Sequence, residues 1–349
     1  MITAPSLSAF IRMLLLGTLC LCAVLNSAGG DETESCADDT LDFGFYASFE
    51  PVSYSADDDP ESEGFNTHLG YEADLLSALE AMQGAGLSFV REAIPVWDEI
   101  WLLSATPRYD LVGGGITILD SRRRDAEGEE KITFTSGHIT FRQSLLARAE
   151  DAEALDSYDK LTSEVRVGAL PGTTGEARLL QITGLADDQG VLAAGARIDT
   201  PQGSLVADGS ADFLITAAMA SPNLIDRLHL HPPVATMPQV IYLGSELGER
   251  ELLEALENGQ IDALARGEIG NQDAAHYTGE AFVVAALDDA TENGGFTLSL
   301  ETPELASCLD EKINWLTDSR QIAYADWLND PTVFMARAET WNERQAQSD

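Results

Sequence analysis

The first third of the chain alternates between strand-like and helix-like patterns of apolar residues. Residues 41–46 and 87–94 have the alternation and β-rich composition of strands, and residues 109–112 form a third short apolar run. Residues 70–82 place their leucines on one face of a helix, and residues 97–103 begin another helix. This order of strands and helices is typical of an α/β domain, so we expect a mostly parallel sheet flanked by helices.

The remaining elements are fewer and more widely spaced. Residues 211–219 predict a helix in the middle of the chain, set off by turn-forming residues on both sides. Near the C-terminus, residues 294–300 predict a strand and residues 303–316 an amphipathic helix. Residues 322–328 predict one more helix, and we find no internal repeat.

The N-terminus has the pattern of an export signal. Arg12 precedes a thirteen-residue apolar run at 13–25, and small residues follow at 27–30. We therefore predict a signal peptide over residues 1–29 and a flexible acidic lead-in over 30–40. An uncleaved membrane anchor stays open as the alternative, although thirteen apolar residues are short for a membrane span. The protein is expected outside the cytoplasm, secreted or periplasmic.

Composition narrows the class of function. The 349 residues include 59 Asp and Glu against 20 Lys and Arg, which gives a formal net charge of −39. Nucleic acid is therefore excluded as a partner, because phosphate binding needs clustered basic residues. A hydrophobic content of 44% in a chain of this length indicates folded domains, with room for two of ordinary size.

A glycine-rich segment carries the candidate binding chemistry. Residues 113–122 read Gly-Gly-Gly-Ile-Thr-Ile-Leu-Asp-Ser-Arg and follow a predicted strand. The glycines let backbone N–H groups approach a ligand closely, and Thr117 adds a hydroxyl. Arg122 carries a planar guanidinium that can grip a carboxylate through two hydrogen bonds. On these residues alone, a plain glycine turn followed by a solvated arginine is the alternative.

Several short segments follow one another in a characteristic order. They are residues 70–75 (GYEADL), 97–100 (WDEI), 109–118 (YDLVGGGITI), 134–136 (FTS), 143–146 (QSLL) and 167–174 (VGALPGTT). In this order they resemble bacterial extracellular solute-binding proteins of the polar amino-acid type (family 3), which deliver ligands to ABC importers. The resemblance covers most of residues 41–180 and then about 255 to the C-terminus.

This resemblance implies a fold and a domain organisation. The family is α/β, with a two-lobed periplasmic-binding-protein-like fold (type II) in which each lobe is a mostly parallel sheet flanked by helices. Lobe 1 would comprise residues 41–140 and 291–349, and lobe 2 residues 141–290. An insertion at about 181–240 exceeds what the family needs at that point. The two lobes would close on a ligand by a hinge motion.

The resemblance also assigns ligand contacts in lobe 1. Phe49 and Trp97 would form aromatic walls around the ligand, with ordinary core packing as the alternative for both. Gly115 would offer backbone contacts and Thr117 a hydroxyl. Arg122 would form a salt bridge to a ligand carboxylate.

In lobe 2 the pattern is less complete. Thr173 and Thr174 would present hydroxyls and N–H groups at a helix N-terminus, either as ligand contacts or as plain helix caps. The family's second carboxylate, which grips the α-amino group of the ligand, aligns with Gly267. Glu268 is the candidate replacement through a shift of one residue, or the ligand lacks that amino group.

Two histidines lie in the insertion at strand-like spacing. His229 and His231 would place two imidazoles on one face of a strand, a pattern that can indicate a metal site. The sequence around these two histidines contains no third metal ligand at a recognisable spacing. We therefore expect no bound metal and no cofactor.

The cysteines permit one disulfide. Cys20 and Cys22 leave with the predicted signal peptide, so Cys36 and Cys308 remain as a possible pair in an oxidising compartment. Two unpaired buried thiols are the alternative. In the family the closing helices pack back on lobe 1, which would bring Cys308 towards the segment that contains Cys36.

The expected function is that of a solute-binding protein, not an enzyme. It would be a monomer that captures a small carboxylate-bearing ligand, an amino acid or a relative, and delivers it to the membrane permease of an ABC transporter. The alternative is a dehydratase acting on prephenate-like or arogenate-like acids, for which Glu176 and Glu268 are the candidate acids. A sensor input module of the same two lobes is a third possibility.

Overall fold

The computed structural model describes residue 36 and residues 40–244 and 248–348, all within one compact unit. The predicted signal peptide and most of the predicted lead-in lie outside the described residues. No helix in the described part of the chain is long and apolar enough to cross a membrane.

The first sheet has five strands around a parallel centre. Its order is β5 (Phe89–Ile94), β1 (Leu41–Tyr46), β6 (Leu111–Gly113), β16 (Thr297–Ser299) and β7 (Ile132–Phe134). β1 runs parallel to β5 and β6, whereas β16 is antiparallel to β6 and β7. The parallel sheet predicted from residues 41–112 is therefore present, with an antiparallel addition from the C-terminal part. A separate small sheet joins β2 (Ser48–Phe49), β3 (Ser53–Ser55) and β4 (His68–Leu69).

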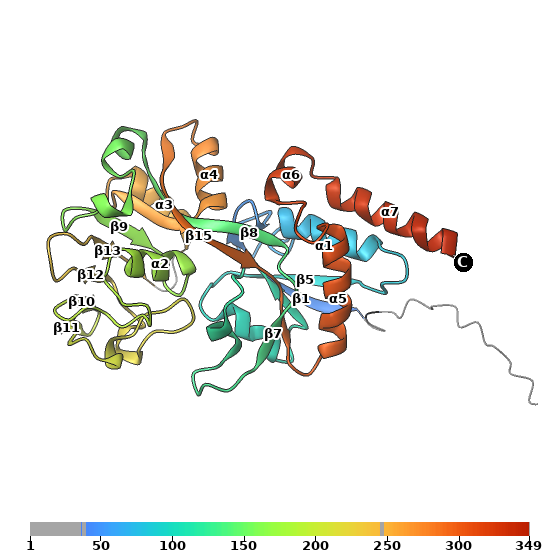
Figure 1. Cartoon of the computed structure of the whole chain (residues 1–349), viewed down its shortest axis with the longest axis horizontal. Coiled ribbons are helices and arrows are strands. Elements are labelled where there is room, and N and C mark those ends of the chain that lie inside the picture. The colour runs from blue at the N-terminus through green and yellow to red at the C-terminus, as the bar shows by residue number, and fades with distance from the viewer. Residues whose placement is uncertain (1–35, 37–39, 245–247, 349) are drawn as a thin grey trace, which may run out of the picture. The chain divides into compact units, whose positions relative to one another are not determined.

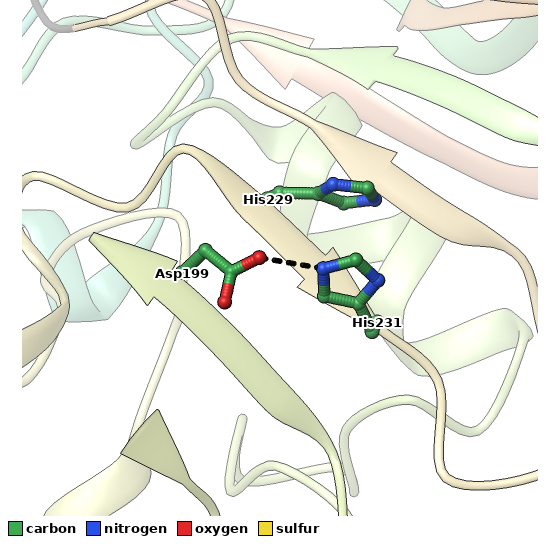
Figure 2. Close-up of side chains that lie close together, drawn as sticks. All are labelled: Asp199, His229 and His231. Carbon is green, nitrogen blue, oxygen red and sulfur yellow. Dashed lines mark hydrogen bonds and ion pairs between the residues drawn. The ribbon is translucent and has the colours of Figure 1, made fainter. Parts of the chain in front are cut away.

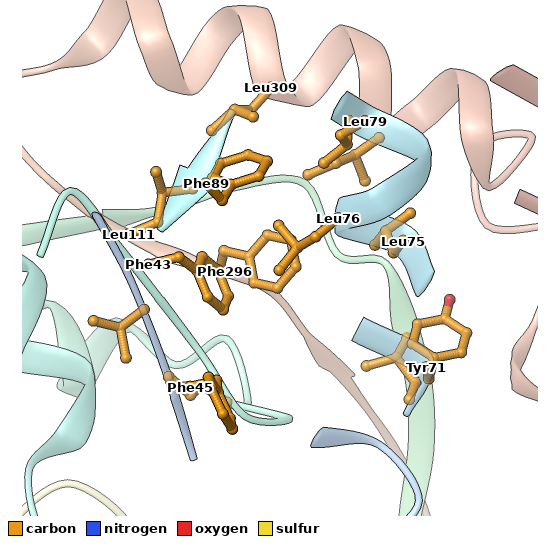
Figure 3. Packing of buried hydrophobic residues seen from close by; sticks show 14 of the residues in the cluster. Phe43, Phe45, Tyr71, Leu75, Leu76, Leu79, Phe89, Leu111, Phe296 and Leu309 are labelled. Atoms are coloured by element: carbon orange, nitrogen blue, oxygen red, sulfur yellow. The ribbon is translucent and has the colours of Figure 1, made fainter. Parts of the chain in front are cut away.

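Helices from both ends of the chain cover this sheet. They are α1 (Tyr71–Ala81), α5 (Pro303–Leu316), α6 (Tyr324–Asn329) and α7 (Val333–Ser348). Figure 1 shows α5 and α7 beside α1. In Figure 3, Leu76 and Leu79 of α1 lie among Phe43, Phe296 and Leu309, which come from distant parts of the sequence. The C-terminal helices thus complete the core that the N-terminal strands begin.

The second sheet has eight strands. Its order is β11 (Gly203–Val206), β10 (Arg197–Thr200), β12 (His229–His231), β13 (Gln239–Ile241), β9 (Arg166–Ala169), β14 (Ala263–Gly267), β8 (Ile139–Arg148) and β15 (Phe282–Gly294). The centre of this sheet, from β13 through β9 to β14, is parallel, and the other pairings are antiparallel. Its helices are α2 (Thr174–Ile182), α3 (Glu249–Glu257) and α4 (Glu268–Tyr277).

Two long strands connect the two sheets. β8 places Ile139 and Phe141 in the core of the first sheet and Leu145 and Ala147 in the core of the second. β15 runs antiparallel to β8, and its register shifts between residues 284 and 286 and between 287 and 291. The chain therefore crosses from the first sheet to the second along β8 and returns along β15.

The helix predicted over residues 211–219 is wrong. Only Ala211–Phe213 form a short 3-10 turn, and the segment then extends so that Leu214 bridges Val191 and Ile215 bridges Ala220. Long-range pairing with the neighbouring loop here overrides local helix propensity. The insertion instead adds strands, and β10, β11 and β12 extend the second sheet beyond β13.

The helix predicted from residue 97 is shorter and tighter than expected. It runs from Ile100 to Ala105 as a 3-10 helix, and Glu99 before it takes a left-handed conformation at φ 50°. Trp97 therefore precedes the helix, outside regular secondary structure, and its indole lies beside the ring of Tyr46.

Cys36 and Cys308 form a disulfide with their Cα atoms 5.5 Å apart. Cys308 lies in α5, and Cys36 lies before β1, so the bond ties the N-terminal segment to the C-terminal helical layer. The sequence separation is 272 residues, and closing a loop of this length strongly restricts the unfolded chain. The pairing proposed from the sequence is the one present.

We predict that replacing both cysteines by serine lowers the free energy of unfolding by about 2–5 kcal/mol. The measurement is urea-induced unfolding followed by tryptophan fluorescence. Treatment of the unreduced, denatured wild-type chain with an alkylating reagent is the control, and it should leave both cysteines unmodified. Unchanged stability in the double variant would contradict the expected role of the bond.

Candidate functional site

A small cavity lies where the first sheet, the second sheet and the crossing strand β8 meet. Its volume is about 40 Å³. The lining residues are Tyr46, Phe49, Trp97, Gly115, Thr117, Phe141, Gln143, Leu170, Thr173, Thr174, Gly175, Glu249, Leu252, Leu264, Ala265, Arg266 and Gly267. Four aromatic rings thus surround a small set of polar groups, the usual composition of a small-molecule site.

Six of the eight ligand contacts predicted from the sequence line this cavity. They are Phe49, Trp97, Gly115, Thr117, Thr173 and Thr174. Arg122 and Glu268 do not line it. The structure therefore brings together residues that are up to 125 positions apart in the sequence. Arg122, which was predicted to bind the ligand carboxylate, lies behind the cavity wall.

Glu72 holds the glycine segment in place. Its carboxylate is fully buried and accepts the N–H groups of Gly114 and Gly115 at 2.7 and 3.0 Å. His138 Nε2 lies 3.0 Å from the same carboxylate. Gly115 has φ +69°, and a Cβ atom there would lie 2.5 Å from the ring of Phe49. A side chain at position 115 would therefore be strained and would collide with the aromatic wall.

The N-terminus of α2 faces the cavity from the second sheet. Thr173 is its N-cap, and the Thr173 hydroxyl accepts the N–H of Glu176 at 3.1 Å and donates to the carbonyl of Leu170 at 2.8 Å. Plain capping thus occupies this hydroxyl. Thr174 and Gly175 also line the cavity, at the end of the helix where backbone N–H groups and the helix dipole favour an anion.

Gln143 is the centre of a polar network across the site. Its Nε2 donates to Thr174 Oγ1 and to Glu292 Oε2, both at 2.8 Å, and Thr117 Oγ1 lies 3.3 Å from Thr174 Oγ1. Because Glu292 can only accept, this pairing fixes which end of the amide is the nitrogen. The other end, Gln143 Oε1, is buried and has no hydrogen-bond partner among the described residues. A buried acceptor of this kind, on a residue that lines the cavity, is a candidate contact for a ligand N–H group.

Arg122 is completely buried behind the cavity wall. Its guanidinium donates to the carbonyls of Ala217, Thr117 and Gly172 at 3.1, 3.3 and 3.0 Å, and lies 4.4 Å from the ring centre of Trp101. Burial lowers the pKa of Arg122 to about 9, against a smaller opposing effect of Glu292. Three of its five N–H groups are thus used, and none of the acceptors they reach carries a full negative charge.

The carbonyl of Gly172 joins the two sides of the site. Trp97 Nε1 donates to this carbonyl at 3.1 Å, and Arg122 Nη2 donates to it as well. Both donors come from the first lobe. Gly172 itself belongs to the loop before α2 in the second lobe, and its N–H donates to Glu176 Oε2 at 2.8 Å. Trp97 therefore closes over the cavity by bonding to the opposite wall.

Glu176 is paired with an arginine of the insertion. Arg227 donates Nε and Nη2 to the two carboxylate oxygens of Glu176, both at 2.7 Å, and both side chains are buried. The guanidinium also lies 4.8 Å from the ring centre of Tyr242. The insertion thus supplies the charge that balances Glu176, which in turn holds the Gly172 loop.

Two charged lining residues were not predicted. Glu249 at the start of α3 and Arg266 at the end of β14 form a buried ion pair, with Arg266 Nη1 2.8 Å from Glu249 Oε2. Burial raises the pKa of Glu249, while Arg266 acts in the opposite direction. Arg266 directly precedes Gly267, so its position could have been found from the alignment; Glu249 lies in a stretch without a recognisable motif.

Glu268 turns away from the cavity. Its carboxylate accepts from Arg142 Nη2 at 3.0 Å. Gly267, by contrast, is a lining residue. A Cβ atom added at this position would lie 3.6 Å from the ring of Phe141 and 3.8 Å from the ring of Phe49. A shift of one residue therefore does not bring the Glu268 carboxylate into the site.

The lining offers groups that can bind a small polar molecule. It combines aromatic surface, amide and hydroxyl groups, a helix N-terminus and one ion pair. Such a set can orient a small polar molecule and exclude water around it.

Comparison with solved structures identifies the fold. An amino-acid ABC transporter substrate-binding protein, AbpA from Streptococcus pneumoniae bound to L-arginine, matches with a TM-score of 0.53 and 16% identity, over 86% of this chain and 96% of that one. Another ABC uptake transporter substrate-binding protein from Streptococcus pneumoniae, with bound histidine, matches with a TM-score of 0.53 and 15% identity, over 90% and 97%.

A third match is the ancestral amino-acid-binding protein AncCDT-1, described as a precursor of cyclohexadienyl dehydratase. Its TM-score is 0.51 and its identity 20%, over 86% of this chain and 95% of that one. No family model and no curated protein matches the sequence. The α/β two-lobed periplasmic-binding-protein fold expected from the sequence is thus confirmed. The expectation of a mostly parallel sheet in each lobe is wrong, because antiparallel pairings join the first sheet through β16 and predominate in the second sheet.

We predict that Arg227→Ala destabilises the protein by about 3–5 kcal/mol, because it leaves the Glu176 carboxylate buried without its partner. Urea-induced unfolding measures this change. Replacing both Arg227 and Glu176 by methionine should recover much of the loss, since no buried charge is then left unpaired.

The matched control is Arg108→Ala, which breaks an exposed ion pair with Glu92 and should change stability by no more than about 1 kcal/mol. If Arg227→Ala proves no more destabilising than Arg108→Ala, the buried pair does not hold the loop.

Proposed function

We propose that this protein is the extracytoplasmic solute-binding protein of an ABC transporter and captures an amino acid, or a related small carboxylate, between its two lobes. The observation that carries the proposal is the site itself, because both lobes contribute to one cavity that combines aromatic walls, a helix N-terminus and an unpartnered buried acceptor. The disulfide supports an oxidising compartment outside the cytoplasm. The membrane permease of the transporter is the proposed partner, and the protein acts as a monomer.

The ligand carboxylate is proposed to lie at the N-terminus of α2. Thr174 and Gly175 offer backbone N–H groups there, with the positive end of the helix dipole behind them. Arg122 lies on the far side of Gly172, and its buried charge has no direct contact with a carboxylate in the described part of the chain. A ligand anion in the cavity would offset that charge through space, or directly if the guanidinium turns towards it.

The opposite end of the ligand is proposed to donate hydrogen bonds. Gln143 Oε1 is a buried acceptor without a partner, so a ligand N–H group placed against it removes a desolvation penalty. In the resembling family a carboxylate binds the α-amino group of the ligand, and this chain has Gly267 at that position. Glu249 is a lining residue that can supply a carboxylate instead. We therefore assign the amino-group contact to Gln143 and Glu249 in place of Glu268.

Binding requires the walls to separate. A cavity of about 40 Å³ holds no more than a few water molecules, so an amino acid cannot fit between walls in this position. We propose that residues 41–140 with 291–349 form lobe 1 and residues 141–290 form lobe 2. The two lobes would then open along the crossing strands β8 and β15. The bond from Trp97 to Gly172 is the contact that opening must break.

One observation favours the dehydratase alternative enough to keep it in the test. AncCDT-1 links this fold to a dehydratase lineage, and burial raises the pKa of Glu249, as a general acid requires. The acids expected from the sequence are less suitable, because neither Glu176 nor Glu268 lines the cavity. Formation of phenylpyruvate from prephenate by the wild type, and its loss in Glu249→Gln, would favour this alternative.

We predict that isothermal titration with a panel of amino acids and small organic acids finds at least one ligand. Gln143→Leu and Glu249→Gln should each weaken its binding by about 1.5–3 kcal/mol, or roughly 10- to 150-fold in Kd, because each removes a buried contact to the ligand. Arg122→Ala should also weaken binding.

The control is Glu268→Gln, which lies outside the cavity and should bind as the wild type does. No binding to any member of the panel, or wild-type affinity in all three site variants, would overturn the proposal.

A further inference from the structure

One face of the inserted strands gathers three side chains that can bind a metal. Asp199 on β10 lies directly opposite His229 on β12 in the antiparallel register. His231 follows two residues after His229 on the same strand, so its side chain projects from the same face. Figure 2 shows the three side chains turned towards one another.

The alternation of these strands fixes the arrangement. Ile198 and Leu230 lie opposite each other between the three polar residues and are fully buried in the core of the second lobe. Neighbouring residues on a strand point to opposite faces of the sheet. Because Ile198 and Leu230 point into the core, Asp199, His229 and His231 point to the outer face. The three side chains are therefore held by rigid strands, with partial access to solvent.

The distances are short enough for one ion. His231 Nε2 lies 2.7 Å from Asp199 Oδ2, and the two imidazole rings have their centroids 3.7 Å apart. One potential ligand atom from each residue lies within 4.8 Å of the other two. In a tetrahedral zinc site with bonds of 2.0–2.2 Å, ligand atoms are about 3.4 Å apart, so modest side-chain rotations would complete the geometry.

We propose that Asp199, His229 and His231 bind a single divalent transition-metal ion of the zinc type. Two imidazoles and one carboxylate suit Zn²⁺, Ni²⁺ or Co²⁺, whereas Mg²⁺ and Ca²⁺ prefer sites made of oxygen ligands alone. Three protein ligands leave a further position for water. Among the described residues, this is the one group of three or more His, Cys, Asp and Glu side chains with a suitable arrangement.

Neighbouring side chains support this role. Gln239 Oε1 lies 2.8 Å from His229 Nε2, and Ser204 Oγ donates to Asp199 Oδ1, so both ligands have partners that orient them. The positive charge of Arg197 acts against the binding of a cation, because its Nη2 lies 3.6 Å from Asp199 Oδ2.

The competing explanation is an ordinary ion pair between His231 and Asp199 beside a second imidazole. The two explanations differ in what His229 does, because it takes no part in that ion pair but would be a full ligand to a metal. A bound ion would also link β10 to β12 and so stabilise the insertion against unfolding. None of the three residues lines the solute cavity, so this site is independent of the proposed function.

The test is titration of the untagged full chain with Zn²⁺ and with Co²⁺ in the presence of excess Mg²⁺. The Mg²⁺ occupies the many surface carboxylates, which would otherwise bind divalent ions weakly. We expect one equivalent of Zn²⁺, a rise in melting temperature, and d–d absorption of Co²⁺ with the intensity of a four- or five-coordinate site.

Four variants decide between the explanations. His229→Ala and Asp199→Asn should each weaken binding by about tenfold or more, and His229→Ala with His231→Ala should abolish the Co²⁺ absorption. His276→Ala is the control and should bind as the wild type does, and circular dichroism of the metal-free variants should match the wild type. Absence of specific binding in the wild type, or Co²⁺ absorption that persists in the double-histidine variant, would overturn the proposal.

Discussion

The contact on which the binding account depends is a single peptide unit, Gly172, which both lobes hold. Arg122 and Trp97 donate to its carbonyl from the first lobe, and Glu176 accepts its N–H within the second. Hydrogen bonds of this kind contribute only about 0.5–1.5 kcal/mol each, or up to 3 when one partner is charged. Bonds of this strength can break and re-form, as the proposed opening of the two lobes requires.

The distribution of buried charge explains why the site favours a particular kind of ligand. Glu176 with Arg227 and Glu249 with Arg266 are balanced pairs, so neither attracts a ligand by net charge. Arg122 is different, because carbonyls and aromatic rings surround it and no carboxylate of the described residues contacts it. In a protein of formal net charge −39, this buried cation beside a helix N-terminus is the feature that would admit an anion.

The elements that the sequence predicted well are those in which local pattern and tertiary packing agree. The strand at residues 41–46 and the helix at 303–316 show regular apolar spacing, and the structure buries nearly all of the strand and the apolar face of the helix. The helix expected at 211–219 failed because pairing with residues 190–192 determines that segment. Spacing along one segment cannot reveal a partner from another.

The same limit applies to the sites. The glycine segment and Trp97 were recognisable because each belongs to a short motif, and both line the cavity. Glu249 could not be assigned, since only the fold brings the start of α3 to Arg266. Asp199 lies thirty residues before His229, and only the pairing of β10 with β12 places it beside the imidazoles.

The central claim is that one ligand contacts both lobes at once, and hydrogen exchange measured by mass spectrometry tests it most directly. On addition of the ligand found by titration, the account predicts slower exchange in two peptides together, one covering residues 113–117 and the other residues 172–177. The first covers the start of the glycine-rich segment, and the second covers the N-terminus of α2. Slower exchange in only one of these peptides, or in neither, would contradict a site shared between the lobes.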